Sequence, residues 1–213
     1  MNHSSLIARE GWPYIGILVL LTIPVALFSY NCYWLIPLGL ALFAAYFFRN
    51  PERSIPVDEG LILSPADGKI MEINTVWEDQ YLKSSAIQVR IFLSLLNVHV
   101  NRVPFPGQVE WLSRSGSTYL PAYKKEAGTS NVSNYIGIHS NNGKIMVVQI
   151  TGLVARRLVC WLKPGDQVQS GERLGLIKFG SCTELYLPIS AEILVQPGEK
   201  VRGGETIIGR FSN

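Results

Sequence analysis

The stretch Leu176-Ile-Lys-Phe-Gly-Ser-Cys-Thr-Glu-Leu-Tyr-Leu-Pro188 decides how the C-terminal part of this chain folds. It places the pair Gly180-Ser181 between two apolar runs, 174–179 and 185–189. Short apolar runs bounded by turn residues predict two β-strands that meet at this pair. The serine is then either part of an ordinary hairpin turn or the site of a reactive main-chain bond, strained between two stiff sheets.

A near copy of one segment lies on each side of this pair. Lys163-Pro-Gly-Asp-Gln-Val-Gln-Ser-Gly-Glu172 precedes it, and Gln196-Pro-Gly-Glu-Lys-Val-Arg-Gly-Gly-Glu205 follows it, with an offset of 33 residues (197 − 164). Each copy is typical of a strand, a Pro-Gly turn, a short strand, a glycine turn and a further strand. Two facing copies predict a small quasi-symmetric β-sandwich, with Gly180-Ser181 on the connection between its halves.

The composition limits the class of protein. The 213 residues fit one soluble domain with a real core and a smaller additional segment. The net charge of +3, without any Arg/Lys run among aromatic residues, excludes a dedicated nucleic-acid binder. The cysteines Cys32, Cys160 and Cys182 form no Cys-x-x-Cys pair and no spaced Cys/His set. We therefore expect no metal site and no disulfide scaffold.

The N-terminal part has the pattern of a membrane anchor. No charged residue occurs from Gly11 to Phe48. Because one spanning helix needs about 20 apolar residues, this run predicts two short transmembrane helices, 14–30 and 33–48, within an anchor of residues 1–50. Aromatic residues near the proposed ends fit an interfacial belt. The alternative is a buried hairpin of the globular domain.

The charges that flank this run predict its orientation. Arg9 precedes the apolar run, and Arg49 and Arg53 follow it. In a hairpin both flanks lie on the positive, cytoplasmic side of the membrane. We therefore expect residues 51–213 to form a cytoplasmic domain at the cell membrane.

From about residue 57 the chain is typical of a mainly β protein. Short apolar runs alternate with turn signals such as Asp67-Gly68, Pro106-Gly107 and Asn142-Gly143, and helical periodicity is scarce. The expected fold is a barrel-sandwich-hybrid-like β domain with quasi-repeated C-terminal halves, preceded by the helical hairpin. The polar residues 114–134 predict a long surface loop.

Two residues besides Ser181 are candidates for chemistry. His99 lies in an alternation that places His99 and Asn101 on one face of a strand and valines on the other. Asp67 lies in the turn Ser64-Pro-Ala-Asp-Gly-Lys69. Taken singly, a half-exposed strand histidine and an ordinary turn aspartate explain both.

The order of five motifs adds information that no single motif carries. These motifs are Phe47-Phe-Arg-Asn-Pro-Glu-Arg53, Ser64-Pro-Ala-Asp-Gly-Lys69, Asn97-Val-His-Val-Asn-Arg102, Gly152-Leu-Val-Ala-Arg-Arg157 and Phe179-Gly-Ser181. Following an apolar segment in this order, they resemble the short-form phosphatidylserine decarboxylase proenzymes, which are pyruvoyl-dependent lyases. The resemblance covers residues 47–213.

The resemblance implies self-cleavage between Gly180 and Ser181. The Ser181 hydroxyl attacks the Gly180 carbonyl, and β-elimination then splits the chain and leaves a pyruvoyl group at position 181. The products, 1–180 and 181–213, remain together as a heterodimer or a higher oligomer. A base must take the hydroxyl proton, and His99 fits this role, with Asp67 holding its tautomer as in a Ser/His/Asp triad.

The resemblance also implies the substrate and the reaction. The pyruvoyl ketone forms a Schiff base with the amine of membrane phosphatidylserine and accepts the electrons released with CO₂. His99 is the expected proton donor, and phosphatidylethanolamine is the product. No metal or diffusible cofactor is required. An archaeal-type ether lipid, archaetidylserine, is the alternative substrate.

Two departures from the family pattern bear on the site. The family's motif continues Gly-Ser-Arg-Val-Asp, whereas this chain has Cys182-Thr-Glu184 after the Gly-Ser pair, so Cys182 is either a second nucleophile or a small strand residue. Long-form members have a second histidine at the position of Arg102. His99 therefore has to serve both cleavage and decarboxylation.

Two other classes of protein share parts of the pattern. The 33-residue repeat resembles the halves of biotinyl and lipoyl carrier domains, which have a lysine at the hairpin tip. Here the nearest lysine, Lys178, falls inside a predicted strand, which disfavours a carrier. A non-catalytic membrane-anchored β module is the third interpretation, in which Asp67, His99 and Ser181 are unrelated turn residues.

Overall fold

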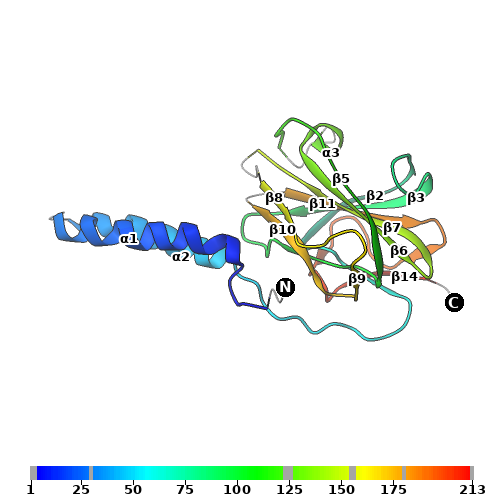
Figure 1. Cartoon of the computed structure of the whole chain (residues 1–213), viewed down its shortest axis with the longest axis horizontal. Helices are drawn as coiled ribbons and strands as arrows, with labels where there is room; N and C mark the ends of the chain where they lie inside the picture. Colours follow the sequence, from blue (N-terminus) through cyan, green and yellow to red (C-terminus); the bar gives the residue numbers. More distant parts are fainter. Residues whose placement is uncertain (1–3, 29–30, 122–126, 154–156, 179–180, 212–213) are drawn as a thin grey trace. The chain divides into compact units, whose positions relative to one another are not determined.

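Figure 1 shows the computed structural model of the chain, which describes residues 4–28, 31–121, 127–153, 157–178 and 181–211. The chain divides into two compact units, one up to Glu52 and one from Arg53 onward. This boundary lies two residues beyond the boundary expected from the sequence.

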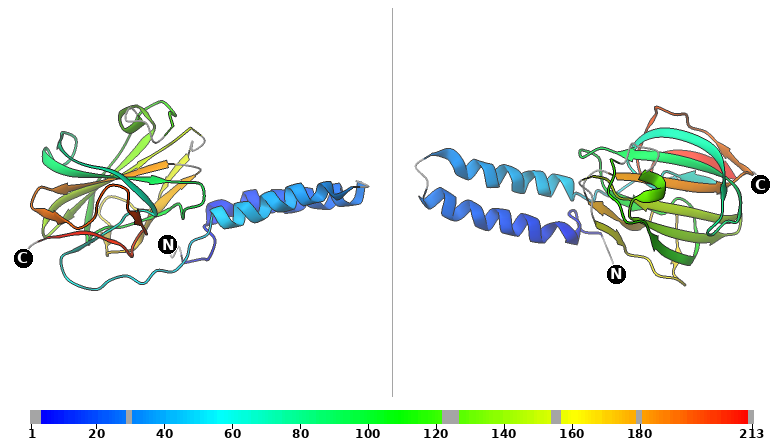
Figure 2. Two further views of the ribbon diagram at one scale, coloured as in Figure 1. Left: turned by 180° about the vertical axis from the view of Figure 1, so that it is seen from behind. Right: turned by 90° about the horizontal axis from the view of Figure 1, so that it is seen from above.

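The first unit is a pair of helices. It contains η1 (Arg9–Gly11), α1 (Trp12–Phe28), η2 (Cys32–Trp34) and α2 (Leu35–Phe47). Figure 2 shows α1 and α2 side by side along their length. The residues Arg9–Phe28 form a helix long and apolar enough to cross a membrane, and no residue of α1 is buried in the protein. A helix that is apolar on all sides and has no buried residue fits a lipid environment.

The second unit is built from strands. They are β1 (Leu61–Leu63), β2 (Gly68–Glu78), β3 (Ser84–Leu93), β4 (Val100–Arg102), β5 (Gly107–Ser115), β6 (Ser133–Ser140), β7 (Gly143–Ile150), β8 (Arg157–Cys160), β9 (Gln167–Val168), β10 (Arg173–Lys178), β11 (Ser181–Pro188), β12 (Ala191–Ile193), β13 (Lys200–Val201) and β14 (Ile207–Phe211). One four-residue helix, α3 (Ala127–Ser130), is also present among the described residues. The prediction of a mainly β fold behind an apolar helical segment is confirmed.

The strands form one large curled antiparallel sheet and two small sheets (Figure 1). The large sheet has the order β13-β2-β3-β11-β7-β6-β5-β9, and the small sheets have the orders β1-β14-β12 and β4-β10-β8. Apolar side chains from all three sheets form one core cluster, including Ile91, Ile138, Leu174, Leu185 and Ile208. The core therefore lies between the large sheet and the small ones, as in a sandwich.

The quasi-repeat predicted from the sequence is present in the backbone. Gly165 and Gly198 have φ values of +95° and +98°, and Gly171 and Gly204 have values of +78° and +77°. Each pair is 33 residues apart, and these left-handed conformations favour glycine over residues with a side chain. The side chain of Ile55 packs against both Gly171 and Gly204. The two copies thus adopt the same turns on either side of one apolar residue.

A second pair of repeats escaped the sequence analysis. The segments Leu63-Ser-Pro-Ala-Asp-Gly-Lys-Ile70 and Arg102-Val-Pro-Phe-Pro-Gly-Gln-Val109 share a proline and a glycine at an offset of 39 residues (107 − 68). β13 pairs with the start of β2 just as β9 pairs with the start of β5. Asp67 occupies the position that Pro106 has in the other copy. The two copies therefore differ here, since only the first has a carboxylate.

The strands on either side of Gly180-Ser181 belong to different sheets. β10 lies between β4 and β8 in a small sheet, whereas β11 lies between β3 and β7 in the large sheet. The two strands are not paired with each other, so the ordinary hairpin left open by the sequence is wrong. The chain crosses between sheets at this point, as the sandwich prediction requires. Gly180, the expected acceptor, lies outside the described residues.

The predicted surface loop 114–134 is only partly a loop. β5 extends to Ser115, and β6 begins at Ser133. Asn131 is 1% exposed, and its side-chain amide donates to the carbonyl oxygens of Leu120 and Thr151, both at 2.8 Å. This buried amide ties the segment to the body of the domain, which polar composition alone does not reveal.

Candidate active site

The large sheet brings the three predicted residues to one edge, by which we mean the side of the sheet formed by the ends of neighbouring strands and not an outermost strand. Asp67 precedes β2, His99 follows the turn after β3, and Ser181 begins β11, and these three strands are neighbours in the sheet. Ser181 pairs with Leu93, the last residue of β3, while Lys69 at the start of β2 pairs with the adjacent Phe92. The topology therefore gathers residues that are 32 to 114 positions apart in the chain (99 − 67 and 181 − 67).

Ser181 is buried in an unusual way. The residue has no exposed surface, and its Oγ has no hydrogen-bond partner among the residues that the structure describes. A buried hydroxyl left without a partner costs about 1–3 kcal/mol. Such groups are rare in native proteins and are often associated with a functional role. Since no described residue gives the Ser181 hydroxyl a structural hydrogen bond, this hydroxyl is a candidate for chemistry.

His99 is fully buried where β10 ends. The Ile177 amide donates to the His99 carbonyl oxygen at 3.1 Å, and the chain enters β11 at Ser181 four residues later. With 0% exposure, His99 is not the half-exposed strand histidine that the alternation allowed. His99 is therefore buried beside the C-terminal part of β10, the last strand that the structure describes before Ser181.

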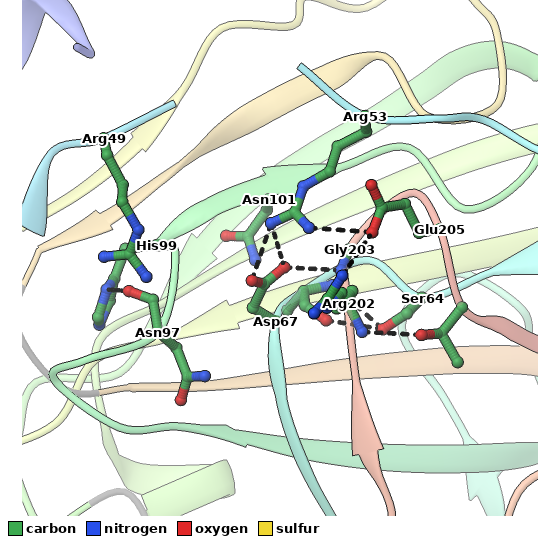
Figure 3. A network of polar contacts seen from close by, with 12 residues as sticks. Arg49, Arg53, Ser64, Asp67, Asn97, His99, Asn101, Arg202, Gly203 and Glu205 are labelled. Atoms are coloured by element: carbon green, nitrogen blue, oxygen red, sulfur yellow. Dashed lines mark hydrogen bonds and ion pairs between the residues drawn. The ribbon is translucent and has the colours of Figure 1, made fainter. Parts of the chain in front are cut away.

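The tautomer of His99 is set by a backbone carbonyl. The Nδ1 atom lies 2.9 Å from the Asn97 carbonyl oxygen (Figure 3). Because a carbonyl oxygen only accepts, Nδ1 carries a proton and the neutral ring has its lone pair on Nε2. Asn97 is itself fixed, since its Oδ1 accepts from the Ser94 amide at 2.9 Å and from the Ser94 hydroxyl at 2.7 Å.

Asp67 has other partners than His99. Arg53 Nη2 lies 3.0 and 2.9 Å from its two carboxylate oxygens, and the Gly203 amide donates to Oδ1 at 2.8 Å (Figure 3). Arg53 Nη1 also donates to Glu205 Oε2 at 3.2 Å. Among the described residues Asp67 makes no hydrogen bond to His99, so Asn97 provides the contact that was expected of Asp67. Sequence reasoning did not identify Arg53 or Gly203 as its partners.

A network of hydrogen-bonded side chains, most of them buried, fixes the start of β11. Asn101 Nδ2 donates to Thr183 Oγ1 at 3.0 Å, and Gln149 Nε2 donates to Asn101 Oδ1 at 2.9 Å. Asn134 Nδ2 continues the chain to Gln149 Oε1 at 3.2 Å. Thr183 shares a strand face with Ser181, so these bonds hold the reactive end of the strand in register. The sequence pointed to Asn101 alone, through its alternation with the valines.

The opposite face of β11 has a different character. Cys182 is fully buried in an apolar cluster, and burial, together with the Glu184 charge, raises the pKa of its thiol to about 12. Glu184 is buried against Arg90, with 3.3 Å between Oε1 and Nε, and burial raises the pKa of its carboxyl above the ordinary value. A thiol with so high a pKa stays protonated at neutral pH, which argues against Cys182 as a second nucleophile.

We expect that Cys182→Ala leaves cleavage at Ser181 within about twofold of the parent rate, because the thiol stays protonated and points away from the Ser181 face. The lost packing lowers stability by about 1–2 kcal/mol. Time courses of fragment formation on denaturing gels measure the first effect, and thermal unfolding measures the second. A Cys182→Ala chain that never cleaves, although folded, would show that the thiol takes part.

A sizeable cavity lies remote from this edge. Its volume is about 690 Å³, and it is lined in part by Val57, Phe105, Asn142 and Gln167. Asn142 lies in the turn between β6 and β7, at the opposite end of β7 from Ile150, which pairs with Cys182. This cavity is therefore not part of the candidate site. No cluster of three His, Cys, Asp or Glu side chains able to hold a metal occurs among the described residues.

Lys178 does not meet the needs of a carrier lysine. It is the last residue of β10 and is only 8% exposed. A lysine that carries biotin or lipoate must present its amine to other proteins, so this position argues against the carrier interpretation.

Comparison with known proteins agrees with this geometry. The chain matches the family described as phosphatidylserine decarboxylase over residues 40–209. It is 48% identical over 212 residues to a phosphatidylserine decarboxylase proenzyme of Carboxydothermus hydrogenoformans, covering 99% of both chains. Proteins of the same name from Symbiobacterium thermophilum and Syntrophus aciditrophicus are 44% and 45% identical, over 97% and 99% of this chain and 96% and 100% of theirs. The chain belongs to the phosphatidylserine decarboxylase family.

Proposed function

We propose that this protein is a phosphatidylserine decarboxylase proenzyme that cleaves itself between Gly180 and Ser181. The observation that carries the proposal is the Ser181 hydroxyl, which is buried without a hydrogen-bond partner among the described residues at the crossing between two sheets. The names of the relatives supply the reaction and the term proenzyme, which implies processing into two chains. They support phosphatidylserine as the substrate and give no support to an archaeal ether lipid or to a carrier.

In the proposed cleavage, Ser181 Oγ attacks the Gly180 carbonyl carbon while His99 Nε2 takes the hydroxyl proton. The Gly180–Ser181 C–N bond breaks, His99 returns the proton to the amine, and an ester joins the two residues. Loss of the Ser181 Cα proton then breaks the Cβ–Oγ bond and releases Gly180 as a carboxylate. The remaining enamine at position 181 takes up water and loses ammonia to become a pyruvoyl ketone.

The strand pairing supports a heterodimer of the two products. After cleavage, the fragment 181–213 contains β11 to β14. β11 pairs with β3 and β7, β13 pairs with β2, and β14 pairs with β1, so all these partners belong to the fragment 1–180. The fragments therefore share two sheets and one core, and separating them would expose that core. We infer that they stay associated without a covalent link.

Decarboxylation uses the same edge of the sheet. A pyruvoyl group at position 181 supplies a ketone that accepts the electron pair released with CO₂. Ser181 fits as its source because no structural hydrogen bond is lost when Oγ leaves. His99, held through Nδ1 by Asn97, presents Nε2 as the atom that delivers a proton in place of the lost carboxylate. Asp67 has a positioning role through Arg53 and Gly203 rather than through His99.

We further propose that residues 1–50 anchor the protein in the cell membrane and that residues 51–213 lie on the cytoplasmic side. The apolar helix Arg9–Phe28 fits membrane association. Sidedness is inferred from Arg9, Arg49 and Arg53, which flank the apolar run.

The test of this function uses the purified full chain and vesicles that contain phosphatidylserine. We expect release of CO₂ and formation of phosphatidylethanolamine, together with a fragment of residues 181–213 whose N-terminus is blocked to sequencing. A chain that neither cleaves nor consumes phosphatidylserine under any condition overturns the proposal. A mass increase on Lys178 would favour a carrier instead.

We expect that Arg53→Ala destabilises the domain because it leaves the Asp67 charge without its main partner. The two side chains are only 8% and 12% exposed, and loss of one partner of such a buried pair costs about 3 kcal/mol. In detergent, the midpoint of thermal unfolding should fall by about 10 °C, and cleavage should slow.

Arg202→Ala is the matched control. Arg202 contacts the same Glu205 carboxylate at 3.7 Å but is 74% exposed, so its loss should change stability by about 0.5 kcal/mol at most. Equal effects of the two substitutions would show that the Arg53–Asp67 pair has no special role.

A further inference from the structure

Exposed leucines flank the edge of the large sheet where β11 begins. Leu95 and Leu96 follow the end of β3 and are 42% and 64% exposed, and Leu153 follows the end of β7 and is 60% exposed. β3 and β7 are the two strands that pair with β11. The leucines therefore lie just beyond the ends of the two strands that neighbour Ser181.

The register places these residues close to the start of β11. Leu93 of β3 lies opposite Ser181, and Ile150 of β7 lies opposite Cys182. Leu95 is thus two residues beyond the partner of Ser181, and Leu153 is three residues beyond the partner of Cys182. The two loops therefore flank the end of the sheet at which Ser181 lies.

The first of these loops is held rigidly. The Asn97 amide donates to the Ser94 carbonyl oxygen at 3.0 Å, and the Asn97 side chain accepts two further bonds from Ser94. Leu95 and Leu96 occupy the corner of this turn. The carbonyl of the same Asn97 holds the imidazole of His99. The exposed leucines are therefore built on the turn that also positions His99.

The charge at this edge complements an anionic surface. The described loop residues 94–97 and 151–153 include no Asp or Glu. The exposed Arg157 begins β8 and lies opposite Lys178, the last residue of β10, in the strand register. The opposite edge of the large sheet also has exposed apolar residues, Trp77 and Ile189, but charges of both signs accompany them. The β2–β3 connection has the exposed Asp79 and Lys83, and Glu192 in β12 forms an ion pair with Arg210.

We propose that Leu95, Leu96 and Leu153, together with Arg157, form a docking rim that inserts into the surface of an anionic phospholipid bilayer. The proposal rests on the proposed function, because a lipid head group has to reach a residue with no exposed surface. The leucines enter the interfacial region of the bilayer, and the arginine contacts anionic head groups. The rim thereby brings the entrance of the Ser181 site to the depth of the substrate's amine.

The test compares two positions of equal exposure at opposite edges of the sheet. Leu96 and Ile189 are each 64% exposed. Leu96→Cys and Ile189→Cys are made in full chains that also have Cys32→Ser, and each is labelled with a nitroxide. The labelled chains are reconstituted in vesicles of phosphatidylserine and phosphatidylcholine. Collision rates of the label with oxygen, which dissolves in lipid, and with a water-soluble nickel complex report its depth.

At position 96 we expect an oxygen-to-nickel collision ratio at least about fivefold higher than at position 189, as for a side chain in the bilayer interface. Equal ratios, both typical of water, overturn the docking rim. If the spectrum of the label at position 96 is broadened by a second nitroxide and the label shows no contact with lipid, the docking rim is also overturned. In that case the leucines contact a second copy of the chain. The depth measurement needs no turnover, so it decides the rim even if the proposed decarboxylation fails.

A second measurement connects the rim to substrate access. For the variant with Leu95→Ser, Leu96→Ser and Leu153→Ser, the ratio of turnover on vesicles to turnover on a water-soluble short-chain phosphatidylserine should fall about tenfold, because apolar contact with lipid is lost. Ile189→Ser, the matched control, should leave this ratio unchanged. If the ratio is the same in the triple variant as in the parent, the rim has no part in substrate access.

Discussion

Replacing Ser181 with alanine should leave the chain intact at 23.7 kDa, with no fragment of residues 181–213 and no decarboxylation. Alanine has neither a nucleophile for the Gly180 carbonyl nor a leaving oxygen on its β-carbon, so both steps of the cleavage are lost. Denaturing gels and intact-mass measurements on the purified chain read this outcome directly. A fragment that begins at residue 181 in this variant would contradict the proposed chemistry.

The same substitution makes an unusual prediction for stability. Because Ser181 Oγ has no hydrogen-bond partner among the described residues, its removal should be neutral or should stabilise the uncleaved chain by about 1 kcal/mol.

Ser133→Ala is the matched control, because Ser133 is equally buried in a strand but donates to the Asn131 carbonyl oxygen at 2.9 Å. Ser133→Ala should cleave normally and lose about 1 kcal/mol. If Ser181→Ala is instead the more destabilising of the two, the Ser181 hydroxyl has a structural role and the central observation is wrong.

Replacing His99 with glutamine should slow fragment formation by about 10² to 10⁴-fold, the range that a general base contributes. Glutamine has a similar size and can keep the hydrogen bond to the Asn97 carbonyl, so the effect separates proton transfer from packing. The measurement is the time course of the 181–213 fragment after the purified chain is brought to its working temperature. The cleaved fraction of the variant should also turn over phosphatidylserine more slowly, because His99 is also the proposed proton donor.

His139 provides the control for this substitution. Its side chain is 55% exposed and forms an ion pair with Glu110 at 2.8 Å when protonated. His139→Gln should therefore cleave and turn over like the parent. If His99→Gln cleaves at the parent rate, another group takes the Ser181 proton. If only turnover falls, His99 serves decarboxylation and not cleavage.

Much of the fold follows from local sequence patterns. The uncharged run from Gly11 to Phe48 predicts the apolar helices, and period-two alternation with glycine and proline turns predicts the strands. The 33-residue repeat predicts matching turns because Gly165 and Gly198 each need a left-handed conformation. These features depend on residues near one another in the chain, so periodicity and turn chemistry are sufficient to find them.

The sequence also identified candidate residues, but not how they are held. Motif order pointed to Asp67, His99 and Ser181, and the sheet gathers all three at one edge. The contact expected between Asp67 and His99 is replaced by Asn97 on the imidazole and by Arg53 and Gly203 on the carboxylate. Roles that were assigned by analogy with a triad depend on geometry that motif spacing does not contain.

The sequence by itself determined the class of each segment, the internal repeat and the Gly-Ser pair that is the candidate cleavage site. Only the tertiary structure decided that β10 and β11 lie in different sheets, that Ser181 Oγ is buried without a partner among the described residues, and that the Gly203 amide contacts Asp67 across 136 residues of chain. The physical reason is that burial and hydrogen bonding depend on which distant segments pack together. A local pattern fixes what a strand presents on each face, but the partner that covers that face comes from elsewhere in the chain.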